Sequence, residues 1–337
     1  MRQIKGPASA PWRRRRGHPA SVRTSRPCLI PIKESGPGSS DGWGVLGRPR
    51  TPPALSSPRT SGGEIMPYRD VLVHVGSDET PALAAAIDFA RRQDARLIGL
   101  GVRPDAWTGL VGIEGLPASA IEALERANDQ DLADAKRRFE ATIERYGYAG
   151  HGEWRSGRGD LIDTIAIHGR YADVIVVDQS DPEREPASFG LAPELALTSG
   201  RPVLIIPRAG AAATPCEHVV VAWNASREAA RAVADAMPLL QRARQVDVLA
   251  VTPPKRDQIP GIDIARHLAS HDVRADVVVR EVPAPDISTE ILNFISERSA
   301  DLLVMGCYGH ARFHEMIFGG VTRSILRSMT VPVLMSH

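Results

Sequence analysis

The sequence predicts an α/β fold made of two tandem Rossmann-like units, each a doubly wound, five-stranded parallel sheet with helices on both faces. The expected strands are continuous apolar runs such as VIVV at 174–177, which is the pattern of strands buried on both faces of a parallel sheet. Helical patterns alternate with these runs. The pattern also occurs twice, since YADVIV at 171–176 recurs as SADLLV at 299–304, and RPVLI at 201–205 recurs as VPVLM at 331–335.

The elements follow from the spacing of apolar residues. In the first unit we expect strands at 71–75, 97–102, 151–155, 174–177 and 203–206, and helices at 80–93, 118–146 and 160–168. In the second unit we expect strands at 218–221, 246–251, 275–279, 302–305 and 331–335, and helices at 226–240, 264–271, 288–299 and 321–329. Thr80, Ser226 and Ser288 each stand at the start of a helical pattern and are expected as N-caps.

Residues 1–66 are basic and rich in Pro, Gly, Ser and Arg, without apolar periodicity. They hold 12 Lys/Arg against 3 Asp/Glu, a net charge of +9, whereas residues 67–337 carry −8. Such a segment buries too little apolar surface to offset its chain entropy, so we expect disorder. Three explanations compete for this segment. It is a transit peptide, a basic arm that contacts nucleic acid or anionic lipid, or translated upstream sequence before a true start at Met66. We favour the third as a hypothesis because the first strand begins just after Met66.

The remaining chain is expected to form a domain at 67–208 and a second at 209–337. Its net negative charge argues against a nucleic-acid surface, and no apolar run reaches the length of about 18 residues that a membrane span needs. Cys28, Cys216 and Cys307 are few, scattered and odd in number, which argues against a disulfide framework and favours a reducing compartment.

A glycine-rich stretch follows the fourth strand of the second unit. Gly306 and Gly309 come after that strand, and Gly319 and Gly320 precede the helix at 321–329. Glycine at such a crossover lets backbone N–H groups approach an anion where a Cβ would collide, although it also simply satisfies a tight turn. Ligands of parallel sheets bind at the carboxyl ends of the strands where the strand order reverses, so the position favours a phosphate site.

Several of these pieces together resemble the universal stress protein family. They are VVVAWNAS at 219–226, the Ala-Asp strand openings at 172 and 300, the spacing Gly306-x2-Gly309-x9-Gly319, and VPVL at 331–334. The resemblance covers nearly all of 68–337 as two tandem copies. It implies a five-stranded parallel α/β fold in each copy, dimer-like pairing, a cytoplasmic role in stress adaptation, and ATP binding in some members.

The resemblance also implies a set of nucleotide-binding positions. These are Ala222, Asn224, Val251, Gly306, Gly309, Gly319, Gly320, Val321 and Thr322. ATP-binding members usually have Asp at the place of Asn224 and Ser or Thr at the place of Gly320, and Thr322 is the nearest alternative hydroxyl. Losing one neutral hydrogen bond removes about 0.5–1.5 kcal/mol, which weakens binding without abolishing it. Ala222 and Val251 would line the adenine slot, and any Mg²⁺ would accompany ATP.

The first unit lacks this glycine pattern. Its fourth strand is followed by DQSDPERE at 178–185, and no glycine appears before Gly190. The acids would repel phosphates, so we expect the first unit to be a structural partner that binds no nucleotide. His310 and His314 stand at i, i+4 spacing, but without an evident third ligand no metal site is predicted there.

No nucleophile–base–acid grouping and no P-loop Gly-Lys-Ser/Thr motif is present in the sequence, so we predict no enzyme activity. The leading hypothesis is a stress-response protein whose second domain binds ATP or a related nucleotide as a regulatory ligand. The alternatives are a ligand-free interaction scaffold and a slow nucleotide hydrolase. Because exposed apolar edge strands tend to be paired, we expect the two units to pair through 203–206 and 333–335, and the chain to be able to form a homodimer.

Overall fold

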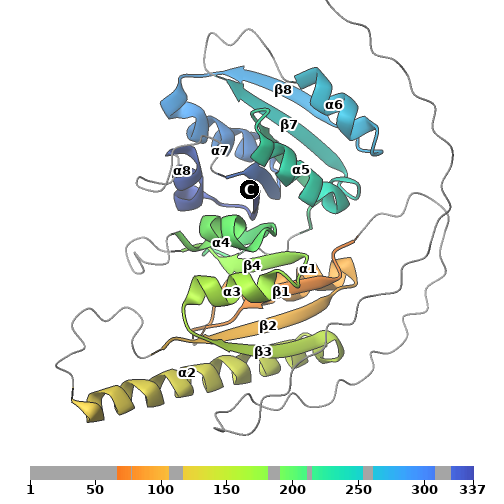
Figure 1. Ribbon diagram of the computed structural model, residues 1–337. Coiled ribbons are helices and arrows are strands. Elements are labelled where there is room, and N and C mark those ends of the chain that lie inside the picture. The colour runs from red at the N-terminus through yellow and green to blue at the C-terminus, as the bar shows by residue number, and fades with distance from the viewer. Residues whose placement is uncertain are drawn as a thin grey trace, which may run out of the picture. The chain divides into compact units, whose positions relative to one another are not determined.

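The computed structural model describes residues 67–76, 78–105, 117–180, 190–210, 215–252, 261–307 and 320–337. Residues 61–337 form one compact unit, and all ten strands of its described residues lie in a single sheet of order β3-β2-β1-β4-β5-β10-β9-β6-β7-β8 (Figure 1). The expectations for residues 1–66 lie outside the described residues.

The first half of the sheet contains five strands and four α-helices. In chain order they are β1 (Asp70–His74), α1 (Pro81–Gln93), β2 (Arg96–Arg103), α2 (Ala118–Arg145), β3 (Gly152–Arg158), α3 (Leu161–Gly169), β4 (Val174–Asp178), α4 (Leu191–Ser199) and β5 (Val203–Ile206). The alternation of strands and helices calls for a fourth helix in this half, but no residue range for α4 was predicted from the sequence. This helix is buried along most of its length and carries Pro193 in its first turn, so it lacks the polar face that marks an amphipathic helix.

The second half repeats this order. It consists of β6 (His218–Trp223), α5 (Arg227–Leu240), β7 (Gln245–Thr252), α6 (Gly261–Ala269), β8 (Asp276–Glu281), α7 (Ile287–Arg298), β9 (Leu302–Gly306), α8 (Gly320–Ser328) and β10 (Val333–Ser336). Within each half every strand pair is parallel, and the strand order reverses between β1 and β4 and between β6 and β9. None of the described helices is long and apolar enough to cross a membrane.

The two halves join through their last strands, as the sequence predicted. Strands β5 and β10 pair antiparallel, with Leu204 opposite Leu334. The outcome is one continuous ten-stranded sheet rather than two separate five-stranded sheets. A strand that is apolar on both faces loses an exposed edge by this pairing, which accounts for the join.

Each half begins with the same hydrogen-bonded clasp. Asp173 accepts from the backbone N–H groups of Arg69 and Asp70 at 2.7 and 3.0 Å, and Asp301 accepts from those of Glu217 and His218 at 2.9 and 3.2 Å. These two aspartates belong to the Ala-Asp pairs that recur in the sequence. The repeated aspartate therefore makes the same two hydrogen bonds in both halves.

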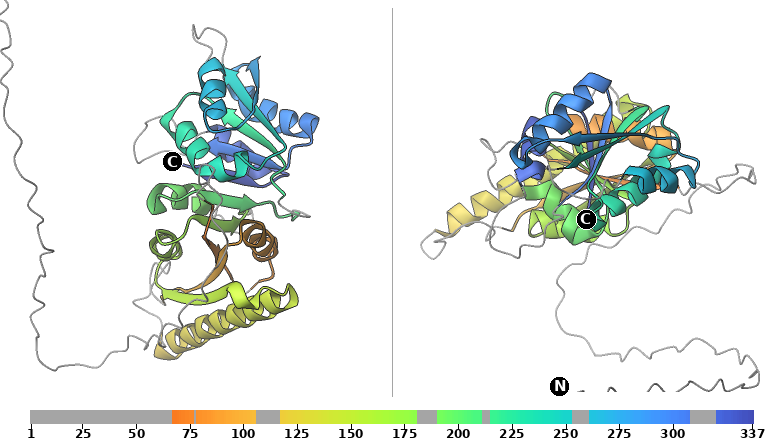
Figure 2. Two further views of the ribbon diagram at one scale, coloured as in Figure 1. Left: turned by 90° about the vertical axis from the view of Figure 1, so that its right-hand side faces the viewer. Right: turned by 90° about the horizontal axis from the view of Figure 1, so that it is seen from above.

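Two hydrophobic cores lie on the two faces of the sheet, and each extends across both halves. One core contains buried side chains of α1, α2, α5 and α6, and the other contains those of α3, α4, α7 and α8. Figure 2 shows helices on both sides of the strands. The predicted inward face of the first helix, Leu83, Ala86, Ile87 and Ala90, is buried. Continuous apolar strands are therefore covered on both faces.

The three predicted N-caps have different outcomes. The Ser226 hydroxyl accepts from the N–H of Ala229 at 3.1 Å and caps α5 as expected. Thr80 is the N-cap residue of α1, but its side chain makes no capping hydrogen bond. The prediction for Ser288 is wrong, because α7 starts one residue earlier with Asp286 as N-cap, and Ser288 is buried inside the first turn.

Tyr68 and Gln179 each donate hydrogen bonds across the boundary between the halves. The Tyr68 hydroxyl donates to the carbonyl oxygen of Asp235 in α5 at 2.6 Å. Gln179 follows β4, and its amide donates to the carbonyl oxygens of Leu326 and Arg327 in α8 at 2.8 and 3.3 Å. Both side chains are buried, so these bonds fix the halves against one another.

Candidate functional site

The candidate site lies at the carboxyl ends of β6 and β9, where the strand order of the second half reverses. Ala222 on β6 stands opposite Met305 on β9 and opposite Leu249 on β7. Gly306 ends β9, and Asn224 begins the turn from β6 into α5. Of the predicted positions, the structure therefore brings Ala222, Asn224 and Gly306 to one edge of the sheet, the edge at which parallel sheets hold ligands.

Gly306 allows β9 to approach the first turn of α5. A Cβ added at Gly306 would lie 2.5 Å from the carbonyl carbon of Glu228 and 2.6 Å from the backbone nitrogen of Ala229. Side-chain atoms essentially never come this close to backbone, so glycine is required by packing at this position. The backbone of α5 occupies the space that the missing Cβ leaves. This supports the interpretation that the glycine is needed for packing.

The first turn of α5 holds a buried carboxylate. The Glu228 side chain is 4% exposed and pairs with the guanidinium of Arg227, which is 80% exposed. Burial raises the pKa of Glu228, but hydrogen bonds from Arg227, from its own backbone N–H and from Ser226 outweigh it, and the net shift is downward. A carboxylate at a helix N-terminus is also stabilised by the helix dipole. The edge of the site thus carries a fixed negative charge with a guanidinium beside it.

Arg227 also reaches His337. The Arg227 Nη2 lies 3.3 Å from His337 Nε2, and His337 Nδ1 lies 3.0 Å from the carbonyl oxygen of Cys307. A carbonyl only accepts, so Nδ1 carries the proton on this side, and Nε2 faces the guanidinium of Arg227. This chain of hydrogen bonds ties β10 to the end of β9.

Cys307 is fully buried in the core beneath the site. Its N–H donates to the carbonyl oxygen of Ser336 at 2.9 Å, which continues the pairing of β9 with β10. Burial raises the pKa of its thiol to about 12, with a smaller rise from Glu228. The thiol is therefore neutral at physiological pH, which agrees with its interpretation as a small residue that fits.

Two further predicted positions border the same edge. The side-chain oxygen of Asn224 accepts from the N–H of Ser226 at 3.1 Å, a local turn that leads into α5. Val251 lies in β7 opposite Arg280 of β8 and is 8% exposed. Asn224 thus uses its carbonyl oxygen within the turn, which leaves its amide N–H groups as the donors for a ligand.

The glycine loop is described only at its two ends. Gly309 and Gly319 lie outside the described residues, as do His310 and His314. Gly320 is exposed and begins α8, and a Cβ added there would meet nothing within 4 Å. Val321 is half-buried. Thr322 is 5% exposed, so its hydroxyl lies in the core rather than at the helix surface.

The equivalent edge of the first half is built differently. Asp178 ends β4 as Gly306 ends β9, and its carboxylate accepts from the N–H of Ala82 in the first turn of α1 at 2.9 Å. A protein carboxylate therefore bonds to the N-terminus of α1 from this strand end. Among the described residues no group of three or more His, Cys, Asp or Glu side chains is placed to hold a metal ion.

Sequence reasoning missed Arg227, Glu228 and His337 at the edge of the second half. In the first half it missed the hydrogen bond of Asp178. Extending the repeat from YADVIV by two residues, to VIVVD against LLVMG, aligns Asp178 with Gly306 and would have found the contrast. Glu228 could also have been predicted, because an acid in the first turn after a serine N-cap is a local signal of a helix start. Nothing local in the sequence indicates that His337 contacts Cys307.

Comparisons with known proteins agree with this architecture. The universal stress protein family model matches residues 215–337. The structure of a universal stress protein from Archaeoglobus fulgidus is similar with a TM-score of 0.62 at 18% identity, covering 79% of this chain and 95% of that chain. A functionally unknown protein from Pseudomonas aeruginosa PAO1 has a TM-score of 0.50 at 16% identity, covering 80% and 92%. The search of curated proteins found no match.

The two structural likenesses extend over both halves and show the fold, while the family model covers the half with the glycine stretch. The resemblance seen in the sequence is thereby confirmed for that half. Residues 215–337 of this chain are therefore similar to the universal stress protein family.

Proposed function

We propose that the chain is a non-enzymatic, cytoplasmic stress-response protein of two universal-stress-protein-like domains, 67–208 and 209–337. The second domain binds ATP or a related nucleotide as a regulatory ligand, and the first is its structural partner. The observation that carries this proposal is the position of Ala222, Asn224 and Gly306 together at the strand-order reversal of the half that the family model matches.

Each part of a nucleotide has a group to meet it. The backbone at Ala222 and Val251 borders the place for the base, and the amide N–H groups of Asn224 suit ribose hydroxyls. The phosphates would lie at the N-terminus of α8, which begins at Gly320 and offers backbone N–H groups. Arg227, largely exposed beside Glu228, adds a cation at the same edge.

The first half is assigned no nucleotide because its strand end carries Asp178 in place of Gly306. The carboxylate accepts from Ala82 N–H, so a phosphate placed there would meet a negative charge that is already hydrogen-bonded. This contrast supports one nucleotide per chain rather than two.

A ligand-free interaction scaffold is the second candidate, and the buried carboxylate of Glu228 favours it. That carboxylate belongs to the first turn of α5, whose backbone lies against Gly306, and its charge opposes a phosphate at this edge although Arg227 pairs with it. A slow hydrolase is a third reading. It would require phosphate release above background that Gly309→Ala abolishes.

Equilibrium dialysis of the full chain with labelled ATP, with and without Mg²⁺, separates the first two candidates. Saturable retention of about one nucleotide per chain supports regulation by a nucleotide. No retention at millimolar ATP would refute nucleotide binding and leave the scaffold.

Gly320→Ser sharpens the test, because it restores the hydroxyl that ATP-binding relatives carry and its Cβ meets no neighbour. One added hydrogen bond of about 0.5–1.5 kcal/mol should tighten ATP binding about threefold to tenfold. Gly320→Ala adds the Cβ without the hydroxyl and is the matched control. Equal affinities for the two variants would show that phosphate does not reach the start of α8.

A further inference from the structure

A cleft opens between the halves, at the opposite edge of the sheet from the glycine stretch. It has a volume of about 230 Å³ and is lined by Arg92, Gln93, Pro215, Cys216, Leu239 and Arg242. These residues come from the ends of α1 and α5 and from the segment that leads into β6. The nucleotide proposal involves none of them.

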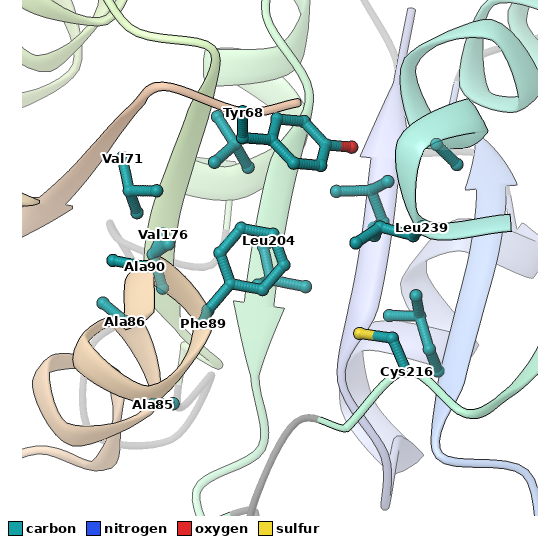
Figure 3. Close-up of a cluster of buried hydrophobic side chains, with 14 of the residues drawn as sticks. Tyr68, Val71, Ala85, Ala86, Phe89, Ala90, Val176, Leu204, Cys216 and Leu239 are labelled. Atoms are coloured by element: carbon teal, nitrogen blue, oxygen red, sulfur yellow. The ribbon is translucent and has the colours of Figure 1, made fainter. Parts of the chain in front are cut away.

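The cleft arises where the two halves differ. Tyr68 and Cys216 both stand two residues before the first strand of their half, just ahead of the aspartate clasp. The Tyr68 ring lies 5.5 Å from that of Phe89 and its hydroxyl bonds to Asp235, so it fills the boundary on its side. Figure 3 shows Tyr68 and Cys216 in the same cluster, with the smaller cysteine side chain near Leu239. On the cysteine side, the smaller side chain lines the cleft.

Two cations border the open space. Arg242 Nη1 donates to the Gln93 side-chain oxygen at 2.8 Å and to the carbonyl oxygen of Arg92 at 3.4 Å, which holds its guanidinium against the end of α1. Within the described part of the chain, no ion pair joins Arg92 or Arg242 to a carboxylate. Both arginines line the cleft, and cationic side chains without a paired carboxylate favour an anion.

Cys216 forms the inner wall and carries no charge. Burial raises the pKa of its thiol to about 12, Asp301 raises it further, and the nearby charge of Arg92 lowers it by less. The wall opposite the arginines is therefore neutral, and Leu239 and Pro215 complete an apolar floor. The cleft combines an apolar base with a cationic rim.

We propose that this cleft binds a small aromatic carboxylate. The ring occupies the space that the Tyr68 side chain fills on the other side of the boundary, and the carboxylate lies between Arg92 and Arg242. A volume of about 230 Å³ corresponds to about eight water molecules of the bulk liquid, which is below the 300–1,000 Å³ typical of sites for drug-sized ligands. The cleft is therefore of a size that suits a single-ring acid.

Isothermal titration of the full chain with benzoate and 4-hydroxybenzoate tests the proposal. Saturable binding is expected for at least one of them, with benzyl alcohol and inorganic phosphate each at least tenfold weaker. Failure of both acids to bind overturns the proposal. Equal binding of benzyl alcohol overturns the role of the arginines, and equal binding of phosphate overturns the role of the ring.

Variants locate the binding. Arg92→Gln and Arg242→Gln should each weaken benzoate at least tenfold, while Arg242→Lys keeps most of the affinity. Arg244→Gln is the matched control, because Arg244 is exposed and pairs with Glu217 outside the cleft, and it should bind as the parent chain does. Unchanged affinity in both cleft variants would overturn the proposed site.

Cys216→Tyr places the side chain of the other half in the cleft and should abolish benzoate binding. If circular dichroism shows that this variant is unfolded, the arginine variants decide the question, since their side chains are exposed and their replacement leaves the core intact. Retained binding in a folded Cys216→Tyr chain would refute the proposal.

Discussion

The carboxylate of Asp178 accepts a 2.9 Å hydrogen bond from the backbone N–H of Ala82, which joins the end of β4 to the first turn of α1. At the equivalent strand end of the second half, Gly306 has no side chain and the first turn of α5 lies directly against it. One half therefore stabilises its helix N-terminus from the strand, and the other does so from within the helix through Ser226 and Glu228.

Asp178→Ala should destabilise the fold by about 1–3 kcal/mol, because the N–H of Ala82 loses its acceptor in a partly buried place. Asp178→Asn keeps an acceptor oxygen and loses only the charge, so its cost should be below about 1 kcal/mol. Urea unfolding monitored by circular dichroism measures both. Equal stabilities of the two variants would contradict a capping role.

Gly306→Ala should cost about 1–3 kcal/mol, because its Cβ would overlap the backbone of Glu228 and Ala229. Gly320→Ala is the matched control. Its Cβ meets no neighbour and it lies in a helix, so it should be neutral or stabilise by up to about 1 kcal/mol. The difference in the free energy of unfolding between the two variants is the measurement, and equal values would refute the packing argument.

Tyr68→Phe should lower the free energy of unfolding by about 0.5–1.5 kcal/mol, since it deletes the 2.6 Å hydrogen bond to Asp235 without changing the ring. Tyr171→Phe serves as control because Tyr171 is 73% exposed, and it should change stability little. Thermal unfolding of the two variants gives the comparison. A larger effect at Tyr171 would show that the bond across the halves contributes nothing.

Stability should fall as the pH drops below about 6.5, and His74 is one cause. Burial lowers the pKa of His74 from its ordinary 6.5 to about 4, so between these values the unfolded chain binds a proton that the folded chain does not. The loss from this residue is at most about 3 kcal/mol at pH 4, and it is absent above pH 6.5, where both states are neutral.

Urea unfolding at several pH values between 7 and 4 measures this slope. His74→Leu should reduce it without removing it, because burial and Arg155 also lower the pKa of His168. His151→Gln, at an exposed position, should leave the slope as it is. A His74→Leu chain with the parent slope would exclude His74 as the source.

Much of the fold was predictable because its strands are apolar on both faces and because the same order of strands and helices occurs twice along the sequence. The join between Leu204 and Leu334 followed from the same argument about apolar edges. The prediction failed for α4, whose buried surroundings remove the polar face, and for the cap at Ser288, because boundaries depend on a single residue.

The candidate site was less predictable. Gly306 was a local signal, whereas Ala222 and Asn224 were predicted from the family resemblance, and the three lie at one edge of the sheet. Glu228 and His337 were missed because their roles come from contacts with Gly306 and Cys307, which are far away in the sequence. The cleft at Cys216 was missed for a different reason. It depends on the difference in side-chain volume between Tyr68 and Cys216. These residues are far apart in the sequence, and they are recognised as equivalent only when the strands of the two halves are aligned with each other.

The antiparallel pairing of β5 with β10 joins two partners that share one polypeptide. A tether of this kind sets their effective concentration at the millimolar level or above, so association does not depend on how much protein the cell makes. Stoichiometry is fixed at one to one, and dilution cannot separate the partners. Expression level is thereby removed as a variable in their assembly, which leaves ligands and neighbouring molecules as the means of control.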